Sequence, residues 1–247
     1  MYYVIHVLAA TLFVVFNTFY GKHFALDKRT AAAISLFGLI TSYGTLILLT
    51  WISNGFTHFG AQNAVRIFAV YPLYIWLASK IFHKDFETIS DFLAVCPMIF
   101  YGVGHYACLI PGCCASFRFV EGSFLYRIAN ALTGTDMLPQ QFVEATEALL
   151  IALVVYVVAR KKNFRTNGKA FFAMLIAYGV SRTFFEFFRD NRKLISFGRM
   201  PGTVDGVLGI SNLALWSIAM IVVGIVGICA LNYAHRKTAA FSETKAV

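Results

Sequence analysis

Two short stretches hold most of the side chains that could do chemistry. The segment GHYACLIPGCCAS (104–116) contains one histidine, three cysteines, a proline and two glycines. The segment SRTFFEFFRDN (181–191) carries Arg182, Glu186 and Arg189 at positions i, i+4 and i+7. At about 100° per residue these three residues share one face of a helix. Guanidinium groups form paired hydrogen bonds with phosphate, so this face is suited to binding a phosphate group.

The cysteine-rich segment is open to three interpretations. By residue type, His105, Cys108, Cys113 and Cys114 could bind zinc, but adjacent cysteines rarely both reach one metal and no C-x₂-C spacing is present. An oxidising location would permit a disulfide from Cys108 to Cys113 or Cys114. We favour a structural turn at the proline-glycine pair, with small cysteines packed where larger side chains would block a cavity. His105, one to two turns earlier, then lies at the wall of that cavity.

The elements that position these residues must be membrane helices. The chain has 247 residues, of which 59% are hydrophobic and 13% are charged, and its mean hydropathy is +0.69. A soluble domain of this length cannot bury so much apolar surface, so the solvent of most side chains is lipid. We expect a single transmembrane helical domain over 1–247, with its first apolar stretch retained as a span rather than removed as a signal peptide.

Seven apolar stretches are long enough to be spans, since a spanning helix needs about 20 mostly apolar residues. The third carries Arg66 and Pro72, and the fourth carries Asp91, Pro97 and His105. Polar groups inside spans are costly and usually functional, so we expect the third and fourth spans to contribute to a functional site. The predicted spans are 2–20, 30–52, 64–82, 88–110, 140–159, 170–188 and 207–232.

The basic residues predict the orientation. With the N-terminus outside and the C-terminus in the cytoplasm, thirteen lysines and arginines lie inside and six lie outside, as the positive-inside rule requires. A basic inner face toward anionic lipid accounts for most of the net charge of +9, so no nucleic acid is needed as a partner. The inside residues are Lys22, Lys28, Arg29, Lys80, Lys84, Arg160, Lys161, Lys162, Arg165, Lys169, Arg236, Lys237 and Lys245, and the outside residues are Arg118, Arg127, Arg189, Arg192, Lys193 and Arg199.

This orientation brings charged residues from four spans to one depth. Arg66, His105, Glu144 and Arg182 all fall in the outer half of the bilayer. Charges there must pair or line a watery cavity. We therefore expect a site for a phospholipid headgroup. The alternative is a purely structural ladder of ion pairs on the sixth span, reaching to the interface.

Four stretches resemble the prolipoprotein diacylglyceryl transferase family, as a divergent member of its Gly-Cys-Cys type. The resemblance covers roughly residues 50–230 in the right order, and the element on span six and the Gly-Cys-Cys turn are its most specific parts. NGFTHFGA (54–61) and SDFL (90–93) resemble two further family elements, the first of them rich in glycine. The four stretches are GHYACLIPGCCAS (104–116), LPQQFVEA (138–145), YGVSRTFFEFFRDN (178–191) and LGISN (208–212).

The resemblance implies a multi-pass protein of the bacterial plasma membrane with no cofactor and no metal. The implied reaction moves a diacylglyceryl group from phosphatidylglycerol to the thiol of a lipobox cysteine in an exported preprotein. By resemblance, Arg182 binds the phosphate, Glu186 orients it, Arg189 guards the outer rim and Glu144 supports the site. Gly60, Asp91, Gly104 and Cys108 are further substrate-binding candidates.

The chain departs from the family pattern at the fourth span. His105 stands where the family has its signature arginine, and Arg66 appears on span three at a similar depth. One hypothesis is that Arg66 supplies the lost positive charge while His105 acts as the base for the incoming thiol. His58 is the next candidate for a catalytic base. The alternative is a diverged relative that binds lipid without this reaction, or that acts on another substrate.

The remaining expectations concern an outer loop and a competing function. The loop 118–138 is partly amphipathic and could form an interfacial helix near a substrate entrance, or a connector packed on the bundle. The competing function is a non-catalytic carrier of lipid or small molecules. A carrier should have helices broken near mid-membrane and often an internal repeat, and the sequence indicates neither.

Overall fold

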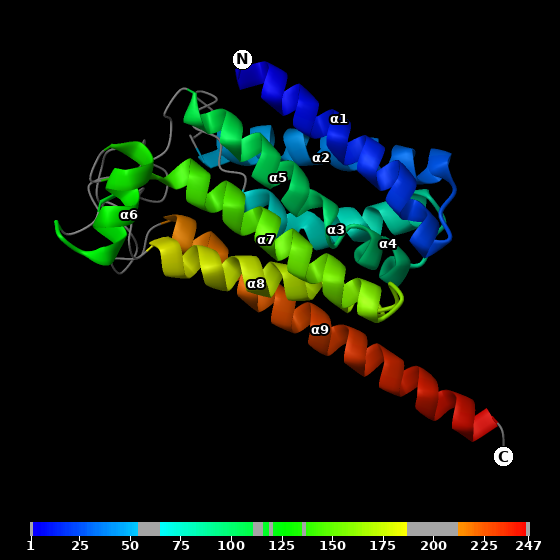
Figure 1. Cartoon of the computed structure of the whole chain (residues 1–247). Coiled ribbons are helices and arrows are strands. Elements are labelled where there is room, and N and C mark those ends of the chain that lie inside the picture. The colour runs from blue at the N-terminus through cyan, green and yellow to red at the C-terminus, as the bar shows by residue number, and fades with distance from the viewer. Residues whose placement is uncertain are drawn as a thin grey trace.

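The computed structural model describes residues 2–53, 65–110, 116–118, 121–134, 137–186 and 212–245 (Figure 1). In these ranges the regular elements are helices, joined by turns, apart from one short antiparallel ribbon in which Ser116 pairs with Pro139 and Arg118 with Met137. The elements are α1 (Tyr2–Tyr20), η1 (Gly21–Phe24), α2 (Lys28–Ser53), α3 (Val65–Ile81), α4 (Phe86–Phe92), α5 (Cys96–Tyr106), η2 (Ala107–Leu109), β1 (Ser116–Arg118), α6 (Phe124–Thr133), β2 (Met137–Pro139), α7 (Gln140–Lys161), α8 (Lys169–Glu186) and α9 (Asn212–Lys245).

The predicted all-α membrane fold is confirmed. Helices occupy all seven predicted positions, and α3 and α8 fall at the third and the sixth. The apolar part of α3, Ile67–Ile81, is shorter than a full span. Within the described ranges, five segments are long and apolar enough to cross a membrane: Tyr3–Phe24, Lys28–Ile52, Phe86–Leu109, Gln140–Lys161 and Ala214–Thr238.

The fourth span is not the single helix expected over 88–110. It is broken between α4 and α5, and Pro97 lies in the first turn of α5. Proline lacks the N–H that would continue the ladder, and its ring clashes with the preceding turn. The sequence reading that found no broken helix is therefore wrong here. The residues of the break, Leu93, Ala94 and Val95, are fully buried in protein, which is where a membrane protein tolerates irregular backbone.

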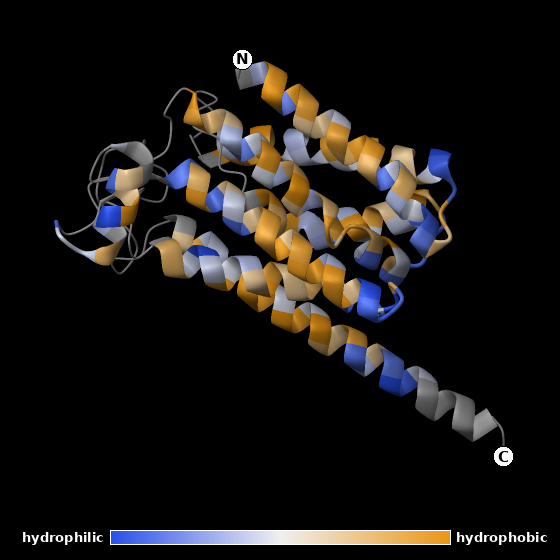
Figure 2. Ribbon diagram, viewed as in Figure 1, coloured by the Kyte–Doolittle hydropathy of each residue, from blue (hydrophilic) through white to orange (hydrophobic). Residues whose placement is uncertain are grey.

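The last helix is longer than expected. We predicted a span ending at residue 232, whereas α9 continues to Lys245. This extension contains no proline or glycine and several good helix formers, so nothing in it stops the helix. Figure 1 shows that it projects beyond the bundle at the end opposite α6. The hydropathy colouring places hydrophilic residues at this end of the molecule and apolar residues along the helices (Figure 2).

Small residues let the central helices approach closely. A Cβ atom on Gly102 of α5 would lie 2.8 Å from Leu149 Cγ and 3.0 Å from the Ala145 carbonyl oxygen, both on α7. A Cβ atom on Gly179 of α8 would lie 2.7 Å from the Ser217 carbonyl oxygen of α9. Because Gly102 has no side chain, α5 lies close enough to α7 for their polar residues to come within hydrogen-bonding distance, and Gly179 likewise lets α8 pack closely on α9.

Candidate active site

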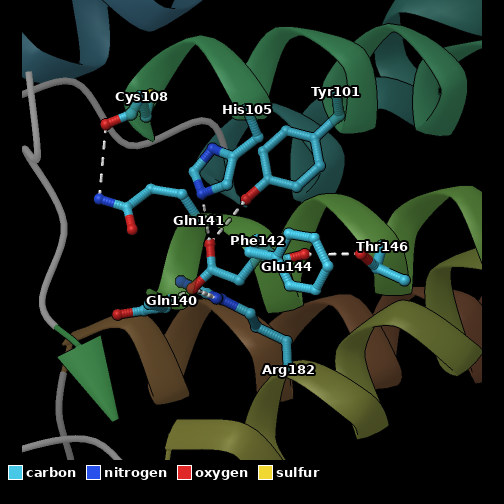
Figure 3. Close-up of polar contacts among 9 residues, drawn as sticks. All are labelled: Tyr101, His105, Cys108, Gln140, Gln141, Phe142, Glu144, Thr146 and Arg182. Carbon is cyan, nitrogen blue, oxygen red and sulfur yellow. Dashed lines mark hydrogen bonds and ion pairs between the residues drawn. The ribbon is translucent and has the colours of Figure 1, made fainter. Parts of the chain in front are cut away.

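Glu144 on α7 is the centre of a buried polar cluster (Figure 3). Its Oε2 atom lies 2.7 Å from His105 Nε2 and accepts a hydrogen bond of 3.2 Å from the Tyr101 hydroxyl. Its Oε1 atom forms an ion pair with Arg182 Nη1 and accepts a hydrogen bond from Gln140 Nε2. Three helices therefore converge on one carboxylate.

Helical spacing explains how two helices each supply two of these groups. Tyr101 and His105 are separated by one turn of α5, and Gln140 and Glu144 by one turn of α7, so each pair lies on one helix face. The Tyr101 and His105 rings are stacked with their centroids 4.9 Å apart. This stacking holds the imidazole at a fixed angle toward Glu144.

Burial makes these polar contacts strong. Glu144 is 1% exposed and Arg182 is 3% exposed. A buried carboxylate without partners would be very costly, whereas this one accepts hydrogen bonds from Tyr101 and Gln140 and is in close ion-pair contact with Arg182 and His105. The cluster is thus a fixed electrostatic unit rather than a flexible surface pair.

His105 is the more accessible member, with 14% of its side chain exposed. A carboxylate can only accept hydrogen bonds, so the tautomer that suits this 2.7 Å contact carries its hydrogen on Nε2. In the neutral ring Nδ1 is then the nitrogen that can take a proton. The pair has the form of a carboxylate that orients an imidazole base.

Further contacts hold the end of α5 against α7. Gln141 Nε2 donates to the Cys108 carbonyl oxygen at 3.5 Å, and the Tyr106 hydroxyl lies 3.0 Å from Thr146 Oγ1. The Thr146 hydroxyl also donates to the Phe142 carbonyl oxygen at 2.7 Å. These contacts fix η2, and with it Cys108, at the edge of the cluster (Figure 3).

The structure brings together three of the predicted site residues, His105, Glu144 and Arg182. The Cys108 carbonyl oxygen accepts a hydrogen bond from Gln141, so Cys108 lies at the edge of this group. Gly104 lies toward α1, because a Cβ atom there would be 3.8 Å from Cδ2 of the His6 ring. The centre of the cluster is Glu144, which the sequence analysis predicted only to support the site.

Asp91, predicted to bind substrate, lies elsewhere. It belongs to α4, and its carboxylate accepts hydrogen bonds from Thr166 N at 2.9 Å, from the Thr166 hydroxyl and from Ala170 N at 3.4 Å. These donors surround the start of α8, so Asp91 ties α4 to the N-terminus of α8. The structure does not bring it to the Glu144 cluster.

Several predicted residues fall outside the described part of the chain. These are His58, Gly60, Arg189 and the pair Cys113 and Cys114 with their turn. Of Arg66 in α3 and Glu186 in α8, only the backbone is described. Among the described residues no group of three histidines, cysteines or acids is placed to hold a metal.

Sequence reasoning missed two members of the cluster, Tyr101 and Gln140. Both lie one helical turn before a residue that was singled out, Tyr101 before His105 and Gln140 before Glu144. An i−4 search from each suspected residue would have found them. Gln140 and Gln141 also lie within LPQQFVEA, which was used only for the resemblance.

A comparison with protein families matches residues 1–230 of the chain to the model described as prolipoprotein diacylglyceryl transferase. The chain belongs to this family. No curated protein matches the chain significantly. The family is one of transferases that act on prolipoproteins and lipid donors. Together with the apolar helices, membership indicates a multi-pass membrane protein.

Proposed function

We propose that this protein transfers the diacylglyceryl group of phosphatidylglycerol to the thiol of a lipobox cysteine in an exported prolipoprotein, at a bacterial plasma membrane. The observation that supports the proposal is the Glu144 cluster, which joins the buried Arg182 guanidinium group to the His105 imidazole in a member of a transferase family. Such a reaction needs a deprotonated thiol and a group that stabilises the phosphate as it leaves.

Arg182 binds the phosphate in this proposal. Its guanidinium group has five N–H donors in a planar fork, so it can keep Glu144 on one side and bind phosphate oxygens on another. Glu144 fixes the direction of the fork. Because the pair is buried, its field acts on the phosphate with little screening by water.

His105 acts as the base. Nδ1 takes the thiol proton, the sulfur forms a bond to the glycerol carbon, and the bond from that carbon to the phosphate oxygen breaks. The electron pair leaves on the phosphate oxygen beside Arg182, and the proton departs afterwards with glycerol phosphate or to water. The Glu144 carboxylate stabilises the imidazolium that forms in between.

Four further predicted residues keep their proposed parts, whereas Asp91 does not, because it binds the start of α8. Glu186 orients the phosphate, Arg189 guards the outer rim, and Arg66 adds a positive charge that offsets the missing family arginine. His58 is the alternative base. Membrane lipids form the surroundings from which phosphatidylglycerol enters.

The decisive experiment mixes the purified protein in detergent with phosphatidylglycerol and a peptide carrying a lipobox cysteine. Release of glycerol phosphate and a peptide mass increased by one diacylglyceryl group are expected. A peptide in which serine replaces the cysteine is the control and should stay unmodified. Lipid binding without release of glycerol phosphate would refute the transferase and favour the carrier.

A further inference from the structure

Glu147 is a buried acid that the proposed reaction leaves unused. It lies on α7 three residues after Glu144, and 7% of it is exposed. Neither of its carboxyl oxygens has a hydrogen bond of normal geometry in the described part of the chain, and the Ser181 hydroxyl of α8 is the donor that comes near. A polar group buried without a partner costs free energy, particularly inside a membrane-spanning helix. This arrangement points to a ligand that supplies the missing partner.

The position of Glu147 relative to Arg182 restricts what that ligand group can be. Three residues of helix correspond to a rise of about 4.5 Å, so Glu147 lies closer than Glu144 to the middle of the span Gln140–Lys161. Ser181 of α8 approaches the Glu147 carboxyl group and directly precedes Arg182. Glu147 therefore lies beside the Arg182–Glu144 pair, on the side nearer the bilayer centre. This holds for either orientation of the chain, because α7 begins at Gln140.

In a phospholipid, the ester groups follow the phosphate toward the bilayer centre. A phosphate bound by Arg182 would place ester carbonyl oxygens near the depth of Glu147. A carbonyl oxygen only accepts hydrogen bonds, so the hydrogen must come from Glu147, and a neutral carboxyl group carries one. The neutral form also needs no second buried cation, since Arg182 is already paired with Glu144.

We propose that Glu147 donates a hydrogen bond to an ester carbonyl oxygen of the bound phospholipid and thereby selects diacyl lipids over their ether analogues. This inference rests on the proposed function, in which Arg182 holds the lipid phosphate. It adds a lipid-binding residue that determines specificity and does not take part in the transfer itself.

The test compares two forms of phosphatidylglycerol with chains of equal length, one diacyl and one dialkyl ether, which lacks the carbonyl groups. Binding of each lipid to the protein in detergent gives the ratio of the two dissociation constants. The wild type should prefer the diacyl lipid by about three- to tenfold, the worth of one hydrogen bond between neutral groups. Glu147→Leu should lose this preference by weakening only diacyl binding. Glu147→Gln should keep most of it, because the amide still donates.

A matched control is Glu121→Leu, which removes an exposed glutamate from the loop before α6 and should keep the wild-type ratio. Equal binding of both lipids by the wild type would overturn the proposal without any variant. Equal weakening of both lipids in Glu147→Leu would also overturn it, since a merely structural residue would act in this way. Failure of the wild type to release glycerol phosphate while the lipid preference persists would refute the transferase alone. Binding of neither lipid would refute both proposals.

Discussion

At the scale of a single residue, Arg182 has two proposed partners, because it must pair with Glu144 and bind a phosphate at the same time. We predict that Arg182→Ala lowers transfer by about two to three orders of magnitude, as expected for the loss of a group that stabilises developing charge. Arg182→Lys should recover only part of the rate, since a point charge lacks the forked geometry. The measurement is glycerol phosphate release by variants shown to be folded.

The control for this change is Arg160→Ala. Arg160 is an exposed arginine in the last turn of α7, far along the helix from Glu144. Its removal should leave the rate unchanged. A folded Arg182→Ala protein with wild-type activity would eliminate the phosphate-binding part that we give to Arg182.

A substitution at His105 can distinguish its role as a base from its role as a hydrogen-bond partner of Glu144. In His105→Gln the amide can still donate a hydrogen bond to Glu144, but no nitrogen can accept a proton at neutral pH. We predict a decrease in kcat of about 10²- to 10⁴-fold, the usual contribution of a general base, with a nearly unchanged KM for the lipid. Steady-state kinetics with varied phosphatidylglycerol measures both. A raised KM with an unchanged kcat would instead make His105 a lipid-positioning residue.

At the scale of elements, the crossing of α5 and α7 brings His105 to Glu144. A valine at Gly102 would meet Leu149 and the Ala145 carbonyl group and push the helices apart. We predict that Gly102→Val costs about 1–3 kcal/mol of stability, typical of overpacking, and lowers transfer as His105 moves away from Glu144. Thermal unfolding in detergent and the transfer assay test the two effects.

Two further variants make this prediction specific. Leu149→Ala removes the side chain that the new valine would strike, so the double variant should regain part of both stability and activity. Gly44→Ala in α2 is the control, because a Cβ atom there meets nothing within 4 Å. If Gly102→Val matches the control in both assays, close contact of α5 and α7 is not what places His105.

At the scale of the whole molecule, the bias of basic residues predicts which end of the bundle faces the cytoplasm. Glu121, before α6, and Asn163, between α7 and α8, are both exposed and lie in connections at opposite ends of α7. We predict that a membrane-impermeant thiol reagent labels Glu121→Cys in intact cells and misses Asn163→Cys until the membrane is opened. The labelling of the parent protein supplies the background. The reverse pattern would invert the orientation and place the Glu144 cluster in the inner half of the bilayer.

The sequence alone determined the membrane class, the seven helix positions, the family resemblance and the grouping of His105, Glu144 and Arg182 at one depth. These follow from hydropathy, spacing along a helix and alternation of spans, which are properties of local sequence. The break at Pro97 was also encoded locally, since proline interrupts a helix ladder, although the long apolar run concealed it.

Only the tertiary structure decided which charge pairs with which. Glu144 and Glu147 lie on neighbouring parts of one helix. Among the described residues, Glu144 is in contact with Tyr101 and His105 of α5 and with Arg182 of α8, whereas only the Ser181 hydroxyl comes near Glu147. Likewise Asp91 and His105 belong to one predicted span. Asp91 nevertheless accepts a hydrogen bond from Thr166 N before α8, whereas His105 contacts Glu144. Depth along a helix can be counted in the sequence. The rotation of each helix and its distance from its neighbours depend on packing at residues such as Gly102, and these decide which side chains meet.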